Sequence, residues 1–415
     1  MKFKSINFLL CTLFLLTSCS ILKNQNGGQE IGAWGPIAYK TNKPSGVYYL
    51  TQEKSPNIKL EVKSTQFRDQ LFLYPSIPLQ IGEIYQLMTD SNSEPALDDI
   101  KVREPCLVYL EDPSGNTEIW KNCPNQGPSQ LTKTDGKVKD LTVSRSGDLV
   151  FFTTTNDLNG TNIWQIKPDG SGTDKLYDCS ETTCSDLDFS PLIGSLGFIQ
   201  TSEMPYIKIL DINSGTITDI QGSGSDLRFS PDGQYLSFLD NLTNQLTIIN
   251  LSNMKSISLQ SGAGLVGDWA PDSQSILYGE FDYWGGIPGV KVFEFNIKSG
   301  ELKQLLYDPN QELEFYQPTY TREAGVYLVT IRQRSAGASK QIWLLGEGAE
   351  GIKQITNDPL YHYSSLSWNP DYSELVFQRY PINTSDGKPQ VVIWNQSSDT
   401  FQVIAENAAN PFWLP

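Results

Sequence analysis

The sequence is poor in the residue types on which many catalytic and metal centres depend. It has one histidine, His362, and six cysteines, none of which form a C-x-x-C pair. A histidine-rich metal centre is therefore excluded, and a Ser-His-Asp triad would have to use His362. The nucleophile-elbow motif G-x-S-x-G is also absent. We expect no metal, no other cofactor and no enzymatic activity.

Basic residues are also in short supply. The chain has 31 Lys and Arg against 47 Asp and Glu, a formal net charge of −16. Nucleic-acid binding needs a basic face for phosphate contacts, so we expect no nucleic-acid partner. An acidic balance of this kind ordinarily serves solubility.

Long apolar runs are missing except at the start of the chain. Residues 6–16 are almost wholly apolar and follow two lysines. The run is too short for a permanent membrane span and fits an export signal over residues 1–18. It ends in L-T-S-C at 16–19, which resembles the bacterial lipobox. That resemblance implies cleavage before Cys19 and acylation of Cys19, which would anchor the chain to a membrane of the cell envelope. An ordinary secretory signal with an incidental cysteine is the alternative.

Four other cysteines form two local pairs. The segment from Cys106 to Cys123 reads as a hairpin that turns at P-S-G-N, which places Cys106 opposite Cys123. Cys179 and Cys184 close a short C-S-E-T-T-C loop. An even number of cysteines in an exported protein fits two structural disulfides, although strand pairing alone does not guarantee the required Cβ distance. A metal site is the weaker alternative.

An internal repeat predicts the fold. A strand motif such as D-L-R-F-S-P-D-G recurs, and its serine-equivalent positions are 144, 190, 230, 270, 321, 369 and 414. After each of the first six, three more β-branched or aromatic runs follow, separated by Gly, Pro, Asn and Asp. A period of 40 to 51 residues is that of one four-stranded propeller blade. We therefore predict an all-β, seven-bladed β-propeller over residues 101–415.

The last repeat is incomplete, and the first blade lacks its inner strand. Residues 105–132 read as strands two, three and four of a blade, whereas N-P-F-W-L-P at 410–415 reads as an inner strand alone. We expect the two to form one shared blade that closes the ring and removes exposed sheet edges.

The repeats resemble those of the TolB-type propeller family, in which S-P-D-G precedes I-A-F, E-I-Y and R-x-L-T. Here the match is carried by S-P-D-G at 230–233, I-W at 119–120, Q-L-T at 130–132 and Q-I-T at 354–356. The resemblance covers roughly residues 105–415. It implies the propeller fold and is nearly silent about activity. The chain lacks the recognisable N-terminal α/β domain of TolB, so TolB's partners are not carried over.

The segment before the propeller is less regular. Residues 19–33 are polar and contain glycine, which predicts a tether. Residues 34–100 contain short apolar runs and are interpreted as a small β-sandwich-like extension. Alternatively, residues 37–50 could belong to an eighth blade.

Candidate binding residues gather in predicted loops of three consecutive blades. Loops that join strands two to three and four to one emerge on one face of a propeller. Aromatic residues and arginine, the types enriched at binding hot spots, concentrate there. The candidates are Tyr283, Trp284, Phe315, Tyr316, Arg332, Arg334, Tyr361, His362, Tyr363 and Arg379. The alternative is that the aromatic side chains only pack these loops onto the rim.

These features predict a non-enzymatic, lipid-anchored binding scaffold of the bacterial cell envelope, on the outer membrane or the outer face of the plasma membrane. Its partner would be an envelope protein or a glycan. The leading alternative is a carbohydrate-active or peptide-hydrolysing enzyme that uses carboxylates in the central funnel. Two adjacent buried carboxylates with perturbed pKa values would favour that alternative. A purely structural role in envelope assembly is a third possibility.

Overall fold

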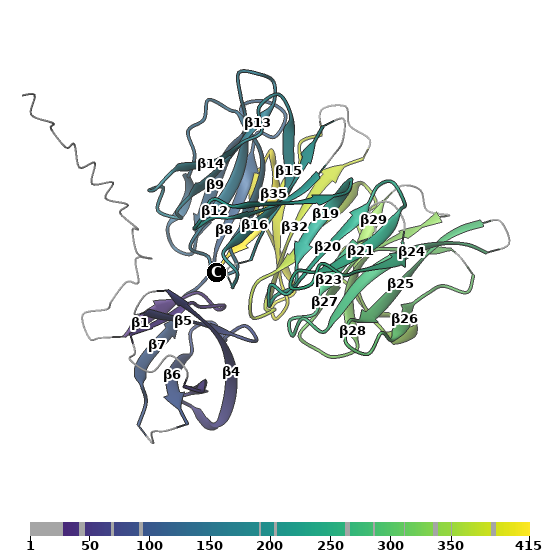
Figure 1. Cartoon of the computed structure of the whole chain (residues 1–415). Coiled ribbons are helices and arrows are strands. Elements are labelled where there is room, and N and C mark those ends of the chain that lie inside the picture. The colour runs from purple at the N-terminus through teal and green to yellow at the C-terminus, as the bar shows by residue number, and fades with distance from the viewer. Residues whose placement is uncertain are drawn as a thin grey trace, which may run out of the picture.

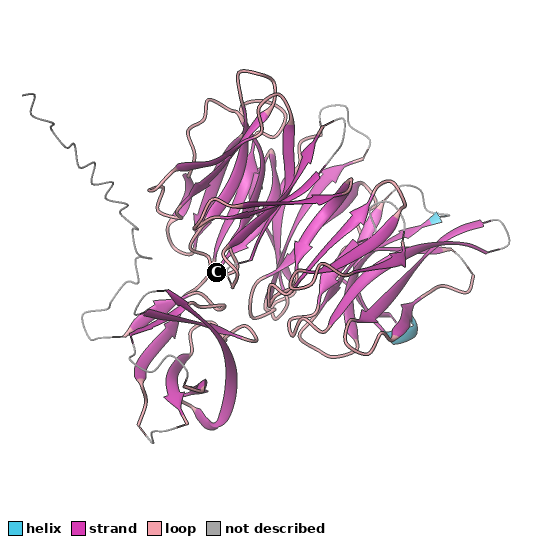
Figure 2. Ribbon diagram, viewed as in Figure 1, coloured by secondary structure: helices cyan, strands magenta, loops and turns pink. Residues whose placement is uncertain are grey.

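The computed structural model describes residues 28–40, 46–67, 70–90, 94–190, 192–202, 206–261, 266–284, 287–310, 312–334, 339–349, 351–382 and 387–415. The predicted signal, Cys19 and most of the predicted tether lie outside these residues. Strands dominate throughout, as Figure 2 shows, and a 3-10 turn occupies Glu347–Ala349. Within these ranges no helix is long and apolar enough to cross a membrane.

Seven four-stranded antiparallel sheets form the propeller (Figure 1), so the predicted fold is confirmed. We number them blades 1 to 7 along the chain. Blade 1 consists of β35 (Ala408–Leu414), β8 (Cys106–Glu111), β9 (Glu118–Cys123) and β10 (Gly127–Gln130), from the inner to the outer strand.

Blades 2 to 4 each run from the inner to the outer strand in chain order. Blade 2 is β11 (Val138–Val143), β12 (Val150–Thr155), β13 (Thr161–Ile166) and β14 (Asp174–Asp178). Blade 3 is β15 (Thr183–Ser190), β16 (Ser195–Thr201), β17 (Tyr206–Asp211) and β18 (Ile217–Gln221). Blade 4 is β19 (Gly224–Phe229), β20 (Tyr235–Asp240), β21 (Gln245–Asn250) and β22 (Ser256–Gln260).

Blades 5 to 7 follow the same order. Blade 5 is β23 (Val266–Trp269), β24 (Ser275–Trp284), β25 (Ile287–Asn296) and β26 (Leu302–Leu306). Blade 6 is β27 (Leu313–Tyr320), β28 (Val326–Gln333), β29 (Lys340–Gly346) and β30 (Gly351–Gln354). Blade 7 is β31 (Tyr361–Trp368), β32 (Glu374–Pro381), β33 (Gln390–Asn395) and β34 (Thr400–Glu406).

Burial within a blade explains why the second strands are so apolar. In β12 and β20 the central residues are all buried, because both faces of the sheet pack against neighbouring blades. The outermost strands β10 and β22 are mostly exposed and correspondingly polar. The hydrophobic core is thus a ring of clusters between successive blades.

Most inner strands carry a bulge at the same position of the repeat. Asp186, Asp226, Gln317, Ser365 and Asn410 occupy it, and all have a positive φ between 49° and 54°. The bulge shifts the register against the second strand. It also brings neighbouring blades together, since the Asp226 amide donates to the Asp186 carboxylate at 3.2 Å.

Blade 1 combines the C-terminal strand β35 with the first three strands of the propeller, as predicted. Strand β35 pairs antiparallel with β8, and the inner strands β11 and β31 of the flanking blades both contact β35. In Figure 1 the yellow β35 lies beside the blue β8. The predicted disulfides Cys106–Cys123 and Cys179–Cys184 are both present. The first joins β8 to β9 within this shared blade.

Residues 28–102 form a separate seven-stranded sheet, which we call the N-terminal extension. The long strand β4 bends strongly (Figure 1), and the sheet encloses one hydrophobic core. The strand order is β1 (Gln29–Ile31), β7 (Leu97–Val102), β6 (Ile84–Thr89), β3 (Tyr48–Gln52), β4 (Ser55–Phe67), β5 (Gln70–Pro75) and β2 (Ile37–Lys40).

The two end strands of this sheet meet. The Gln29 side-chain amide donates to Ala38 O at 2.7 Å and accepts from Ala38 N at 3.3 Å. The extension is therefore one rolled sheet, where we expected a sandwich. The tether predicted for 19–33 was too long, because Gln29–Ile31 pair with β7. Residues 37–50 belong to this sheet, so the alternative of an eighth blade is wrong.

The extension lies against one end of the propeller, where the turns between first and second strands emerge. We call this end the turn face and the opposite end the loop face. A cavity of only about 30 Å³ separates the two parts, and turn residues of blades 2 to 5 line it together with Trp34 of the extension. The Arg145 guanidinium lies 5.4 Å from the Trp34 ring centroid, and Lys63 pairs with Asp232 at 3.6 Å. The extension therefore lies over the turns of blades 2 to 5 at this end of the propeller.

Candidate functional site

The loop face carries the residues singled out in the sequence, but several lie in strands where loops were predicted. His362 belongs to β31 and Arg379 to β32. Phe315 and Tyr363 are buried in the cores of blades 6 and 7, so their assignment to an exposed patch was wrong. Their positions in β27 and β31 alternate with outward-facing residues, a strand periodicity that the loop assignment missed.

Two further candidates, Tyr283 and Trp284, lie at the tip of the β24–β25 hairpin, opposite Pro288 and Ile287. Their side chains lie outside the described residues. The structure brings the remaining candidates together at the adjoining ends of blades 6 and 7. We call this group the loop-face patch. It comprises Glu314, Tyr316, Arg332, Arg334, Lys340, Tyr361, His362, Arg379 and Tyr380.

The blade 6 part of the patch is organised by Glu314, whose side chain is only 6% exposed. Its carboxylate accepts from Arg332 Nε at 2.5 Å and from the Tyr316 hydroxyl at 2.8 Å. Arg334 Nε lies 3.3 Å from the other carboxylate oxygen. Arg334 Nη2 is buried and has no hydrogen-bond partner in the described part of the chain. One carboxylate therefore accepts a hydrogen bond from Arg332 and forms an ion pair with Arg334, whose Nε makes no hydrogen bond among the described residues.

Lys340 and His362 connect blade 6 to blade 7. The Lys340 ammonium lies 3.8 Å from the Tyr316 ring centroid, and the Lys340 amide donates to His362 Nδ1 at 3.3 Å. Burial and the Arg332 charge lower the pKa of Lys340. Burial and the Lys340 charge lower the pKa of His362, so the imidazole is neutral at pH 7. Because its Nδ1 accepts that bond, His362 here orients the patch rather than acting as a charged group.

On blade 7 the Arg379 guanidinium lies 4.6 Å from the Tyr361 ring centroid. Its Nε donates to Gln390 Oε1 at 2.7 Å, and the Gln390 amide donates to Glu406 at 2.6 Å. This network fixes the position of the Arg379 guanidinium. The next residue of β32, Tyr380, is exposed, and its ring lies 5.2 Å from that of His362.

The patch thus places three cationic side chains, Arg332, Arg334 and Lys340, around one buried carboxylate. Arg379 adds a fourth cation on the adjoining end of blade 7. Positive charge clustered on an acidic protein, beside aromatic rings, suits an anionic ligand. Sequence reasoning missed Glu314 and Lys340. The signal was present, because Glu314 stands opposite Arg332 in the β27–β28 pairing, but charge pairing across strands was not considered.

Carboxylates also gather on the inner strands. Burial, together with the Asp186 charge, raises the pKa of Asp140 to about 6. Burial also raises the pKa of Asp188, Asp226 and Asp268. The Asp140 carboxylate accepts from Leu141 N at 2.8 Å, and such bonds give it a structural role. No group of three His, Cys, Asp or Glu among the described residues is arranged to hold a metal ion.

No protein-family model and no curated protein matches this sequence. Solved propeller structures are similar to it in fold. Prolyl endopeptidases share 13% identity, with a TM-score of 0.54 over 74% of this chain and 49% of theirs. TolB from Acinetobacter baumannii shares 13% identity, with a TM-score of 0.44 over 89% of this chain and 83% of its own.

An oligogalacturonate lyase from Vibrio parahaemolyticus also shares 13% identity, with a TM-score of 0.43 over 65% of this chain and 73% of its own. At such identities the likeness extends to fold alone. The similar structures include both enzymes and a TolB protein, so the similarity does not indicate whether this chain catalyses a reaction or binds a partner. The chain is a seven-bladed β-propeller protein whose N-terminal extension lies against the turns of blades 2 to 5.

Proposed function

We propose that this protein is a lipid-anchored binding scaffold of the bacterial cell envelope, whose loop-face patch recognises an anionic surface of a partner. The observation that carries this proposal is the arrangement of Arg332, Arg334 and Lys340 around Glu314 and Tyr316. The cations are held in place before any ligand arrives, which reduces the entropy lost on binding. The partner is an envelope protein or a glycan that presents carboxylates.

The binding role is tested by crosslinked pull-down from envelope membranes, followed by mass spectrometry. We expect the double variant Lys340→Glu/Arg379→Glu to lose the partner that the wild-type protein captures. These two cations are chosen because reversing Arg332 would leave the buried Glu314 without its partner. The matched control is Lys255→Glu/Lys298→Glu, which makes the same charge change at exposed sites outside the patch. Equal capture by both double variants would contradict the proposal.

The proposed anchor is tested separately. Growth with an alkyne-labelled palmitate should label the wild-type protein, and Cys19→Ala should abolish both the label and membrane association. Retention of the lipid label by Cys19→Ala would refute acylation at this residue.

A second candidate function has one specific observation in its favour. The Asp140 carboxylate neighbours Asp186 and has a raised pKa, which meets part of the signature set out for a funnel hydrolase. Incubation of the protein with envelope glycans and peptides tests it. New reducing ends or amino termini that Asp140→Asn abolishes would support catalysis. Product formation that is equal in both proteins would indicate contamination.

A further inference from the structure

One lysine of the loop-face patch lacks a carboxylate of its own. The Lys340 ammonium lies 3.8 Å from the Tyr316 ring centroid, and within the described part of the chain it forms neither an ion pair nor a hydrogen bond. The carboxylate whose charge reaches it, Glu314, is already engaged by the Arg332 guanidinium and the Tyr316 hydroxyl. Lys340 is therefore a partly buried amine whose positive charge has no direct counterion.

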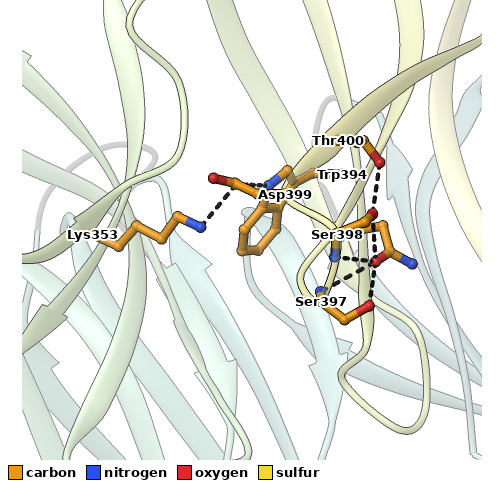
Figure 3. Close-up of polar contacts among 7 residues, drawn as sticks. Lys353, Trp394, Ser397, Ser398, Asp399 and Thr400 are labelled. Carbon is orange, nitrogen blue, oxygen red and sulfur yellow. Dashed lines mark hydrogen bonds and ion pairs between the residues drawn. The ribbon is translucent and has the colours of Figure 1, made fainter.

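Lys353 is the matched case, because its ammonium also lies near an aromatic ring. It is 4.9 Å from the Trp394 ring centroid. As Figure 3 shows, Lys353 also pairs with Asp399 at 2.8 Å, and Asp399 accepts from the Trp394 indole N–H at 2.9 Å. A carboxylate partner favours the protonated ammonium, which has no lone pair with which to attack a ligand. Lys340 has the aromatic ring without the carboxylate.

The surroundings of Lys340 favour the free amine. The Arg332 guanidinium lies 5.8 Å from the same Tyr316 ring centroid, so two cations share one ring. Burial and the Arg332 charge lower the pKa of Lys340, whereas the hydrogen bond to Glu347 raises the pKa of Lys303. Removal from water and a neighbouring cation are the two conditions that make a lysine amine nucleophilic. Both hold at Lys340.

The same neighbours would position an anionic ligand. The Arg332 side chain is 38% exposed, so its guanidinium can meet a ligand carboxylate from solvent. Because Arg332 and Lys340 lie around one ring, a ligand held by Arg332 is held close to the Lys340 amine. Such positioning raises the effective concentration of a reacting group. The ligand that uses both residues has a carboxylate for the guanidinium and an electrophilic carbon for the amine.

We propose that Lys340 captures a carbonyl compound that carries a carboxylate, by forming a reversible imine with it. The inference rests on the anion-binding role proposed above for the loop-face patch. The lone pair of Lys340 Nζ forms a bond to the carbonyl carbon, and the carbonyl π electrons move to the oxygen. That oxygen then leaves as water with the two amine hydrogens, which creates the C=N bond. Water reverses the reaction, and no oxidant or reductant takes part.

The proposal is tested by trapping the imine with sodium cyanoborohydride. The detergent-solubilised full chain is incubated with millimolar pyruvate or, as the neutral ketone, acetone, and the modified lysines are quantified by peptide mass spectrometry. Lys353 and the exposed Lys255 serve as internal controls. We expect the adduct at Lys340 to exceed that at either control roughly tenfold or more with pyruvate. The excess should be much smaller with acetone, and the ratio between lysines cancels the intrinsic reactivity of each ketone.

Lys340→Arg separates this inference from the proposed function. It keeps the positive charge, so it should still capture the partner of the loop-face patch, but it has no amine that can form an imine. Its matched control, Lys255→Arg, should keep the adduct at Lys340. Adduct formation at Lys340 no faster than at Lys255 would overturn the covalent step, even where partner capture is normal. An equal excess with pyruvate and acetone would overturn the requirement for a carboxylate.

A second pair of probes identifies the source of the carbonyl group. Glucuronate has a carboxylate and a reducing-end aldehyde, and glucose is its neutral counterpart. A larger excess at Lys340 with pyruvate than with glucuronate would assign the site to α-keto acids. The reverse order would assign it to the reducing end of an acidic saccharide. Absence of an excess with both anionic probes would refute the proposal.

Discussion

The guanidinium group of Arg103 holds the Pro415 oxygen with two nitrogens, at 3.1 Å from Nε and 2.6 Å from Nη2. Nη2 also lies 3.3 Å from Gly147 O in the first turn of blade 2. Arg103 directly follows β7 of the N-terminal extension. One side chain therefore joins the extension, blade 2 and the last strand of the shared blade.

Arg103→Ala should therefore loosen ring closure. Hydrogen bonds from a charged donor contribute about 1.5–3 kcal/mol each, and we expect a loss of that order in the free energy of unfolding. Urea denaturation followed by tryptophan fluorescence measures it. Lys101→Ala, whose side chain is 48% exposed, is the control and should change stability by less than about 0.5 kcal/mol. An unchanged urea midpoint for Arg103→Ala would show that the contact is incidental.

The two disulfides should contribute unequally to the free energy of unfolding. Their cysteines are separated by 17 and 5 residues. Chain-entropy arguments then give about 3 kcal/mol for Cys106–Cys123 and about 2 kcal/mol for Cys179–Cys184. Paired Cys→Ser variants, compared by urea denaturation, measure the difference. The reverse order would mean that the denatured state, or packing around Cys179, governs the effect.

The contribution of Asp140 to the free energy of unfolding should increase as the pH falls from 7 to 4. Its pKa is about 6 in the folded protein, above the usual value of 3.8, because burial disfavours the carboxylate. The folded state therefore binds the proton more tightly, and the stability gained below pH 4 is lost as the pH rises through 6. The amount is about 3 kcal/mol.

Asp140→Asn should remove the share of this dependence that Asp140 contributes and stabilise the protein at pH 7, since an amide oxygen can still accept from Leu141 N. Denaturation at pH 4, 5, 6 and 7 tests it. Asp169→Asn is a control in which the pH dependence of stability should change in the opposite direction. Hydrogen bonds from Ser171 lower the pKa of Asp169, so its contribution is present at pH 7 and is lost on acidification. A wild-type-like pH profile for Asp140→Asn would refute the assignment.

Met254→Gly should stabilise the protein. Met254 is 50% exposed and has φ = 57° in the turn between β21 and β22, where blade 5 has Gly300 with φ = 72°. Relief of the left-handed conformation outweighs the added chain entropy, for a gain of about 0.5–1 kcal/mol. Gly300→Ala is the mirror control and should destabilise, since a Cβ there meets nothing and only the backbone is strained. Loss of stability in Met254→Gly would indicate packing that exposure does not reveal.

The propeller was predictable because strand periodicity and turn residues recur in each repeat, and both depend only on residues close together in the sequence. The pairing of Cys106 with Cys123 followed from one hairpin register, and the closure by residues 410–415 followed from a missing strand. The rolled N-terminal extension was not predictable, because its closure depends on the Gln29 side chain reaching Ala38. That contact leaves no periodic signal.

The candidate site was predictable only in part. Arg332, Arg334, Tyr361 and Arg379 do share one surface, but Phe315 was assigned wrongly because its strand was read as a loop. The cleft between blades 6 and 7, which Trp368, Tyr372 and Trp394 line, escaped notice altogether. Its lining residues come from two blades, so no single repeat of the sequence indicates it.

The shared blade also delays completion of the fold during synthesis. Strand β8 has no inner neighbour until β35 is synthesised, and their pairing joins residues as far apart as Cys106 and Leu414, 308 positions along the chain. At about 5–20 residues per second, that interval is of the order of 15–60 s. Throughout it the edge of β8 is open to wrong pairing, while the nearby Cys106–Cys123 link can already form. The ring therefore closes only once β35 has been made, so a chain that lacks β35 is left with an open edge at β8.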